Sequence, residues 1–387
     1  MASIGSEHAP RPVWRSSWRL SSSVPWGEQI NSAVARAHAL FADGSDSSLV
    51  RRLAGAAFII RVASAAIAFV SQILLARWMG SFEFGIYIYA WTWVLLIGGM
   101  ADLGLASAAQ RFIPEYTEHK KFALLRGFLR GSRWLALIIS SAVAGAGALA
   151  IWLLSPHLAP ETIVPLYLSC PMLAMFALWQ VQGGIARSYN WVNLGLSPVY
   201  VLRQLMLLVL MGLAYAFGFP TDAVTATIVG VITLFTVGIG QLGILNRRLA
   251  GAVEGGPRAY APRAWLAVST PIFVVEAFYL LLSYSDIIIL QQYRPANEVA
   301  IYYAAVKTLA LVAFIYYSVA QTIAHKFAEY HVAGDRKRLT AFVKQSVQLT
   351  FWPSLAAIVL LLVFGRPLLR LYLSLIHISE PTRQAEI

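Results

Sequence analysis

Nine long apolar runs constrain this chain more than any other feature of its sequence. Each run is close to the roughly 20 residues that an α-helix needs to cross a bilayer. The runs are too long for strands and lack the period-two alternation of a membrane barrel. They predict an all-α fold, a polytopic bundle of transmembrane helices. The predicted spans cover residues 54–76, 85–109, 134–154, 162–186, 194–217, 223–245, 264–290, 300–323 and 347–363.

The composition and the distribution of charge agree with a membrane protein. Hydrophobic residues make up 58% of the chain and charged residues 12%, against roughly 45–50% and 25% in soluble domains. A net charge of +12 could indicate nucleic acid, but the basic residues cluster between the apolar runs. The N-terminal segment and the even-numbered loops hold 22 Lys and Arg, and the odd-numbered loops hold four. This bias predicts a cytoplasmic N-terminus and cytoplasmic even loops, and no nucleic-acid partner.

A weak internal repeat relates two parts of the chain at an offset of 215 residues, the difference between positions 298 and 83. Glu83 matches Glu298 and Phe112 matches Phe327, and an Ile-Tyr pair and a Glu-Tyr pair recur as well. Predicted spans one to three therefore correspond to spans seven to nine. Because six spans separate the copies, both enter the membrane in the same direction. Transporters built from such parallel repeats bind substrate between their two halves.

The repeat and the loops together predict the domain organisation. A polar cytoplasmic segment precedes a six-helix bundle, and a cytoplasmic linker leads to the start of a second bundle, with three helices and part of a fourth. These parts cover residues 1–53, 54–250, 251–263 and 264–372, respectively.

Ionisable side chains inside the predicted spans are the candidate site residues. Such residues are costly in lipid, so they usually face the bundle interior or a wet cavity. Snorkelling to the interface and structural ion pairs are the alternatives. The candidates for the substrate cavity are Arg61, Arg203 and Lys307. The candidates for ion coupling are Glu276, Asp102 and Asp286, of which the two aspartates lie near the membrane interfaces.

Two of these candidates occupy equivalent positions, because Arg61 lies 215 residues before Glu276. If one faces a central cavity, the symmetry of the repeat suggests that the other does too. We therefore predict that Arg61 and Glu276 face each other across the pseudo-two-fold axis, on the cytoplasmic half of the cavity.

The sequence contains no constellation typical of an enzyme. It has no Walker motif, no HExxH, and no Cys-rich spacing for a metal. The predicted outer loops are short and carry few carboxylates, whereas a membrane enzyme of polysaccharide assembly is expected to need acidic groups there. We therefore expect no catalytic residues, no metal and no cofactor.

Two stretches resemble the polysaccharide biosynthesis (O-antigen flippase) family of the multidrug/oligosaccharidyl-lipid/polysaccharide exporter superfamily. The first, Leu74 to Tyr116, contains a short outer turn, a Gly-Ile-Tyr helix start and the element Asp-Leu-Gly-Leu at Asp102–Leu105. The second, Ser285 to Asp335, repeats the outer turn and an Ala-Ile-Tyr helix start.

The resemblance implies a multi-pass protein of the bacterial cytoplasmic (inner) membrane. Its expected activity is the flipping of polyprenyl-pyrophosphate-linked oligosaccharide for O-antigen of lipopolysaccharide, capsule or exopolysaccharide. The expected partners are this substrate, membrane lipids and polysaccharide assembly proteins. The resemblance also implies a cationic central cavity and ion coupling. A small-molecule or drug antiporter of the same superfamily is an alternative, and a membrane enzyme of polysaccharide assembly is a third.

The chain departs from the family near its end. Family members usually have about twelve or more helices, whereas nine spans are predicted here. The stretch LSLIHISEPTR, Leu373 to Arg383, reads as a translated sequencing adapter. We expect native sequence to end near Tyr372, so that residues 373–387 are a non-native tail and the helix bundle is truncated.

Overall fold

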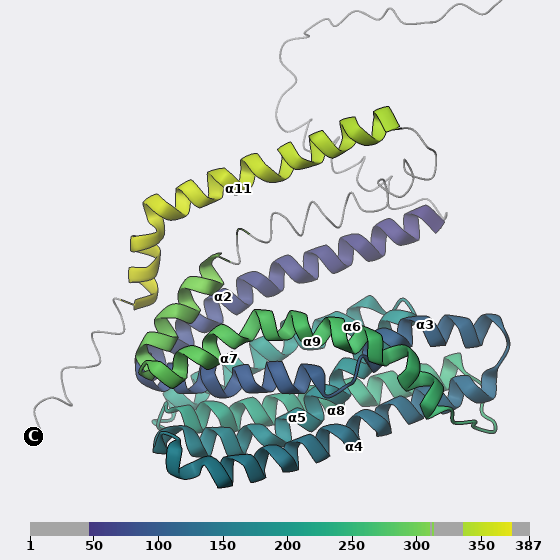
Figure 1. Cartoon of the computed structure of the whole chain (residues 1–387), viewed down its shortest axis with the longest axis horizontal. Helices are drawn as coiled ribbons and strands as arrows, with labels where there is room; N and C mark the ends of the chain where they lie inside the picture. Colours follow the sequence, from purple (N-terminus) through teal and green to yellow (C-terminus); the bar gives the residue numbers. More distant parts are fainter. Residues whose placement is uncertain (1–45, 310–311, 313–335, 374–387) are drawn as a thin grey trace, which may run out of the picture. The chain divides into compact units, whose positions relative to one another are not determined.

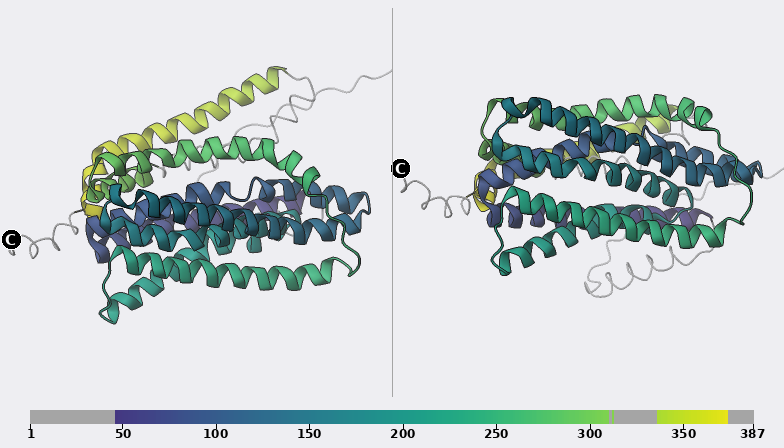
Figure 2. Two further views of the ribbon diagram at one scale, coloured as in Figure 1. Left: turned by 60° about the horizontal axis from the view of Figure 1, so that its bottom comes forward. Right: turned by 90° about the horizontal axis from the view of Figure 1, so that it is seen from below.

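The computed structural model describes residues 46–309, 312 and 336–373. The chain divides into two units, residues 1–52 and 53–387, and the first is described only over 46–52, where α2 begins. All regular structure in the described residues is helical, as Figures 1 and 2 show. The predicted all-α class is therefore confirmed. Of the predicted non-native tail, residues 373–387, only Leu373 is described, as the last residue of α11 (Arg336–Leu373).

The first element, α2 (Asp46–Trp93), contains the first predicted span and the beginning of the second, residues 85–93. A straight helix of its 48 residues would be about 72 Å long, more than twice the hydrocarbon thickness of a bilayer. The helix is broken at Gly80, which has φ 79° and ψ 167°. Glycine reaches positive φ without steric cost. The short outer turn predicted between the first two spans is thus centred on Gly80.

The second predicted span is wrong in its second half. After the π-helical turn η1 (Val94–Gly98), the chain leaves the helix through a turn over residues 101–104, and α3 (Leu105–Glu118) begins a new helix. Leu103 and Gly104 have positive φ, 50° and 71°. The Asp102 carboxylate stabilises the break because it accepts hydrogen bonds from two backbone N–H groups beyond it, those of Gly104 at 3.2 Å and Ala106 at 3.1 Å.

The remaining helices follow the predicted spans but extend further. They are α4 (Phe122–Leu154), η2 (Ser155–His157), α5 (Pro160–Ser188), α6 (Val192–Ser197), η3 (Pro198–Leu202), α7 (Arg203–Ala216), α8 (Ala223–Ala252), α9 (Pro262–Tyr293), a helix over 296–309, and α11 (Arg336–Leu373). The largest differences are at α11, which is longer than the predicted span 347–363 at both ends, and at α4, which begins twelve residues before the predicted span at 134. Its first three turns are basic, and hydropathy detects only the apolar part of a helix.

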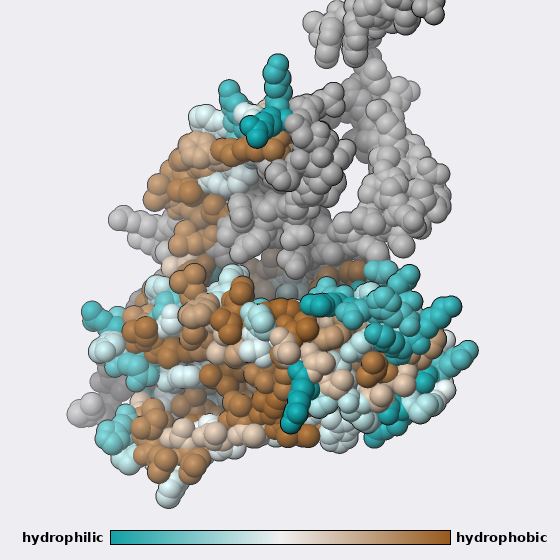
Figure 3. Space-filling view, turned by 45° about the vertical axis from the view of Figure 1, so that its right-hand side comes forward, coloured by the Kyte–Doolittle hydropathy of each residue, from teal (hydrophilic) through white to brown (hydrophobic). Residues whose placement is uncertain are grey.

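Seven helices of the described part are long and apolar enough to cross a membrane. The first, Ala63–Gly98, contains the break at Gly80 and covers parts of the first two predicted spans, 54–76 and 85–109. The eighth predicted span, 300–323, lies largely outside the described residues. Figure 3 shows apolar side chains over the middle of the helices and hydrophilic ones gathered towards their ends. The chain is therefore a multi-pass membrane protein.

Helix α5 holds the described core together. It packs against α3, α4, α6 and α8, and its Trp179 is completely buried. One apolar cluster joins α2, α5, α7 and α8 to the helix at 296–309, and a second joins α3, α4, α5 and α8 to Trp265 at the start of α9. Many large apolar side chains face outward, as lipid contact requires; Leu282, for example, is 83% exposed.

Candidate functional site

Two of the predicted cavity cations, Arg203 and Lys307, lie against aromatic rings. Arg203 is the first residue of α7, where the π-helical turn η3 ends. Its guanidinium carbon lies 4.3 Å from the ring centre of Trp91 on α2. The Lys307 ammonium lies 5.0 Å from the ring centre of Tyr303, one turn earlier on its own helix. Both cations therefore face protein rings and are held there by cation–π attraction.

Tyr303 connects the two cations. Its hydroxyl accepts a hydrogen bond of 3.0 Å from the Gln72 amide, and its ring packs edge-on against Phe84. Arg203 interacts electrostatically with both Tyr303 and Tyr87. We call the group formed by Tyr87, Trp91, Arg203, Tyr303 and Lys307 the aromatic–cation cluster. Its first three members belong to the predicted first bundle and the last two to the second.

The charge of this cluster is not neutralised within the described part of the chain. No carboxylate there forms an ion pair with Arg203 or Lys307. A cation at mid-membrane costs about 2.5–3.5 kcal/mol on insertion scales, and a desolvated cation–π contact recovers about 2 kcal/mol. Arg203 gains one further hydrogen bond, to the Gln204 side-chain oxygen at 2.8 Å. The rings and this amide offset most of the cost but leave two positive charges available to an anion.

The rings of the aromatic–cation cluster are buried in this structure, whereas its two cations are half-buried. Tyr87, Trp91 and Tyr303 are each less than a tenth exposed. Close by, the segments predicted to be the outer turns of the two repeat copies touch. A Cβ on Gly85 would lie 1.8 Å from the carbonyl oxygen of Ala296, so only glycine fits there. The two predicted halves are therefore in contact beside the buried rings of the cluster.

The predicted ion-coupling residues fall into two places. Glu276 on α9 accepts a hydrogen bond of 2.6 Å from the Ser107 hydroxyl of α3. Asp102, which is 2% exposed, interacts electrostatically with Glu276. We call Asp102 and Glu276 the acidic pair. Asp286 belongs to neither group, because its carboxylate accepts a hydrogen bond of 2.8 Å from the Tyr302 hydroxyl and so joins α9 to the next helix.

The predicted approach of Arg61 to Glu276 stays a prediction, because the side chain of Arg61 lies outside the described residues. Ser107, which sequence reasoning missed, supplies a described partner for Glu276. A serine two residues after Asp-Leu-Gly-Leu carries no signal of its own, since hydropathy and spacing say nothing about which helix it faces.

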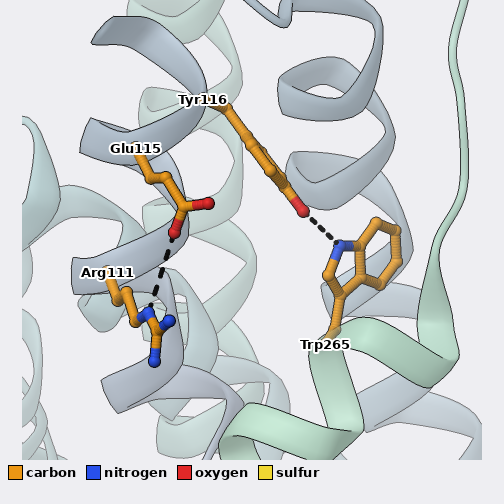
Figure 4. Close-up of polar contacts among 4 residues, drawn as sticks. All are labelled: Arg111, Glu115, Tyr116 and Trp265. Atoms are coloured by element: carbon orange, nitrogen blue, oxygen red, sulfur yellow. Dashed lines mark hydrogen bonds and ion pairs between the residues drawn. The ribbon is translucent and has the colours of Figure 1, made fainter. Parts of the chain in front are cut away.

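A buried contact between α3 and α9 was also missed. The indole N–H of Trp265 donates a hydrogen bond of 3.1 Å to the Tyr116 hydroxyl, as Figure 4 shows. Trp265 is 1% exposed and lies edge-on to Phe128. The neighbouring Arg111–Glu115 ion pair, at 3.7 Å, points away from this contact. The only sequence signal near this contact was the Glu-Tyr pair of the internal repeat, Glu115-Tyr116. Its tyrosine forms the hydrogen bond with Trp265.

The comparisons with known proteins agree with this architecture. Residues 52–325, more than half of the chain, match the family described as polysaccharide biosynthesis protein. The chain belongs to this family. A second family, MatE, matches residues 271–384 of this polysaccharide biosynthesis family member. A comparison with curated proteins finds no match.

Solved structures share the fold of this polysaccharide biosynthesis family member at low sequence identity. An inward-facing multidrug resistance MATE family transporter of the MOP superfamily is 16% identical, with a TM-score of 0.62 over 81% of this chain and 75% of that one. A MATE transporter in the straight conformation is 17% identical, with a TM-score of 0.58 over 85% and 77%. The MATE multidrug transporter DinF-BH is 16% identical, with a TM-score of 0.56 over 85% and 75%. The predicted family and exporter-superfamily fold are therefore confirmed.

Proposed function

We propose that the chain flips a polyprenyl-pyrophosphate-linked oligosaccharide across the bacterial cytoplasmic membrane, for O-antigen, capsule or exopolysaccharide. Its N-terminus and even loops face the cytoplasm. The observation that carries the proposal is the aromatic–cation cluster, in which Arg203 and Lys307 come from different halves of the chain and share Tyr303 as a neighbour. Membership of the polysaccharide biosynthesis family supports the same substrate class.

The chemistry of the cluster suits such a substrate. A dehydrated pyrophosphate is too costly to bury unless cations and hydrogen-bond donors compensate it. A guanidinium can donate two parallel hydrogen bonds to phosphate oxygens, and an ammonium adds a compact charge. Separation of the two halves would open the cluster to one side of the membrane, and substrate would bind between them. Such rocking of two halves around a fixed site is the usual basis of alternating access.

We assign ion coupling to the acidic pair. Glu276 sits between α9 and α3, one from each predicted half, and its hydrogen bond from Ser107 lies on that junction. Proton uptake by the Glu276 carboxylate would remove its charge and weaken this junction. Movement of the halves would then depend on the proton gradient. Asp286, whose contact joins consecutive helices, is the weaker coupling candidate.

The rival function is export of small molecules by an antiporter of the same superfamily, which the MatE match and the solved multidrug transporters favour. For an organic cation, the aromatic–cation cluster is an unfavourable site because it already carries two positive charges. Such a substrate would bind at the acidic pair instead. The two functions therefore require different residues, Arg203 in one case and Glu276 in the other.

Proteoliposomes containing the full chain separate the two functions. In one assay the vesicles carry a fluorescent lipid-linked oligosaccharide, and a membrane-impermeant quencher reports arrival in the outer leaflet. In the other, they are loaded with a cationic rhodamine dye. The flippase proposal expects Arg203→Gln to slow oligosaccharide flipping about tenfold or more, because a charge-assisted contact is lost. Arg247→Gln, which removes an exposed charge on α8, is the matched control. Efflux of the dye without oligosaccharide flipping would establish the antiporter instead.

A further inference from the structure

A basic cavity lies outside both the aromatic–cation cluster and the acidic pair. It is formed between α4 and α8, beneath the segment that leads to α9, and its volume is about 570 Å³. Four arginines and one carboxylate residue line it: Arg126, Arg130, Arg133, Arg258 and Glu254. We call this cavity the basic pocket. No residue proposed for the substrate or for ion coupling lines it.

The inner two arginines are held in place by neutral oxygens. Arg126 donates to the backbone carbonyls of Pro257 at 2.9 Å and Glu254 at 3.1 Å. Arg133 donates to the carbonyl of Leu129 at 2.7 Å and to the side-chain oxygen of Asn246 at 2.6 Å. Carbonyl and amide oxygens orient a guanidinium but do not cancel its charge. The inner wall of the basic pocket therefore stays positive.

The outer two arginines are available to a ligand. Arg130 and Arg258 are both exposed, and neither forms an ion pair within the described part of the chain. Glu254 is the one acidic residue of the lining, so the lining carries a net charge of +3. Four guanidinium groups around one opening make a strong site for phosphate, since each can offer a bidentate contact.

The rest of the basic pocket is apolar. Leucines of α4, α5 and α8, among them Leu137, Leu178 and Leu242, line its wall. Trp134, at the rim, is 53% exposed, and α4 continues from there into an apolar span. Half-exposed tryptophan is typical of the membrane interface. The pocket thus joins a cationic mouth at headgroup level to an apolar wall that runs into the membrane.

We propose that the basic pocket binds an anionic phospholipid, with its phosphate among the four arginines and an acyl chain along the apolar wall between α4 and α8. Basic pockets between transmembrane helices on the cytoplasmic side are known to recognise such headgroups. In the orientation proposed above, this phospholipid belongs to the cytoplasmic leaflet. The lipid site does not depend on which substrate the protein transports. Because Arg126 also holds the segment before α9, bound lipid would fix the junction between the two bundles.

The proposal is tested by titrating the full chain, purified in a neutral detergent, with phosphatidylglycerol while binding is followed by native mass spectrometry. Phosphatidylethanolamine tests the need for net charge, and glycerol 3-phosphate tests the need for the acyl chain. Arg130→Gln/Arg258→Gln removes the two exposed cations. Arg111→Gln/Arg247→Gln removes two exposed cations elsewhere and is the matched control.

We expect phosphatidylglycerol to bind much more tightly than phosphatidylethanolamine. Each basic residue near a headgroup contributes about fivefold in affinity, so Arg130→Gln/Arg258→Gln should weaken binding about 30-fold. The control variant should stay within about twofold of the parent chain. Equal binding of the two lipids, an equal loss in the control variant, or unchanged binding in Arg130→Gln/Arg258→Gln would each overturn the proposal. Equally tight binding of glycerol 3-phosphate would also overturn it and leave a free-anion site.

Discussion

Replacement of Tyr116 by phenylalanine deletes the hydroxyl that accepts the hydrogen bond from the buried indole N–H of Trp265. The ring of residue 116 stays, so packing against Phe112 is preserved. The indole N–H, in contrast, is left without this acceptor in a site that is 1% exposed. An unsatisfied buried donor costs about 1–3 kcal/mol in soluble proteins, and polar contacts in membrane proteins lie towards the lower end. We expect Tyr116→Phe to destabilise the fold by about 1–2 kcal/mol.

The measurement is reversible unfolding of the chain from mild detergent by a denaturing detergent, followed by tryptophan fluorescence. A double-mutant cycle with Trp265→Phe isolates the hydrogen bond from the loss of indole volume. Its coupling energy should be about 0.5–1.5 kcal/mol, the net value of one neutral hydrogen bond. Because the contact joins α3 to α9, the same variants should also loosen the junction between the two predicted bundles.

Tyr189→Phe is the matched control. The Tyr189 hydroxyl is buried, yet it has no hydrogen-bond partner in the described part of the chain. The residue follows the last turn of α5, outside the membrane span, and burial raises its pKa to about 12. Removal of an unpaired buried hydroxyl should be neutral or slightly stabilising. The reasoning fails if Tyr116→Phe and Tyr189→Phe change the unfolding free energy by the same amount.

Three further predictions concern other parts of the chain. Gly85→Ala places a Cβ against the backbone carbonyl that begins the helix at 296–309, 1.8 Å away, and should destabilise the fold by about 1–3 kcal/mol in the same unfolding assay. In Glu276→Gln, the amide oxygen can still accept the hydrogen bond from Ser107, but the side chain cannot take up a proton. Transport should therefore lose its pH dependence while the chain still inserts. An unchanged pH profile would exclude coupling at this residue. Reporter fusions after Gly256 and Asp222 should locate to the cytoplasm and the outside, respectively, and a shared location would contradict the orientation.

Hydropathy was sufficient to predict the helices because lipid imposes one rule on every span: about 20 apolar residues with all backbone groups paired internally. Hydropathy failed where side-chain hydrogen bonds or charged residues determine where a helix begins or ends. The turn at residues 101–104 interrupts an apolar run because the Asp102 carboxylate accepts hydrogen bonds from two backbone N–H groups that a helix would have bonded. The start of α4 at Phe122 was missed for another reason, since its three arginines lower the mean hydropathy although Leu125 and Phe128 are buried.

The candidate site was predictable residue by residue but not as an arrangement. Arg203 and Lys307 stand out in sequence because cations are rare in apolar spans. Their common neighbour Tyr303 does not, since aromatic residues are frequent in membrane helices for reasons of packing and anchoring. A cation in a span faces protein rather than lipid when aromatic rings pack against it. Contacts between segments more than a hundred residues apart, such as that of Arg203 with Trp91, leave no periodic pattern in the sequence.

The internal repeat gives the strongest link between sequence and arrangement. With the offset of 215 residues, Gly85 corresponds to Ala300 and Ser81 to Ala296. The structure brings Gly85 against Ala296, so the helix after the first outer turn meets its own counterpart from the second half. Equivalent elements touch one another where they lie next to the symmetry axis. Trp91 and Tyr303 lie one to two turns further along these same helices, and they contact Arg203 and Lys307, so both cations lie near this contact between the two predicted halves.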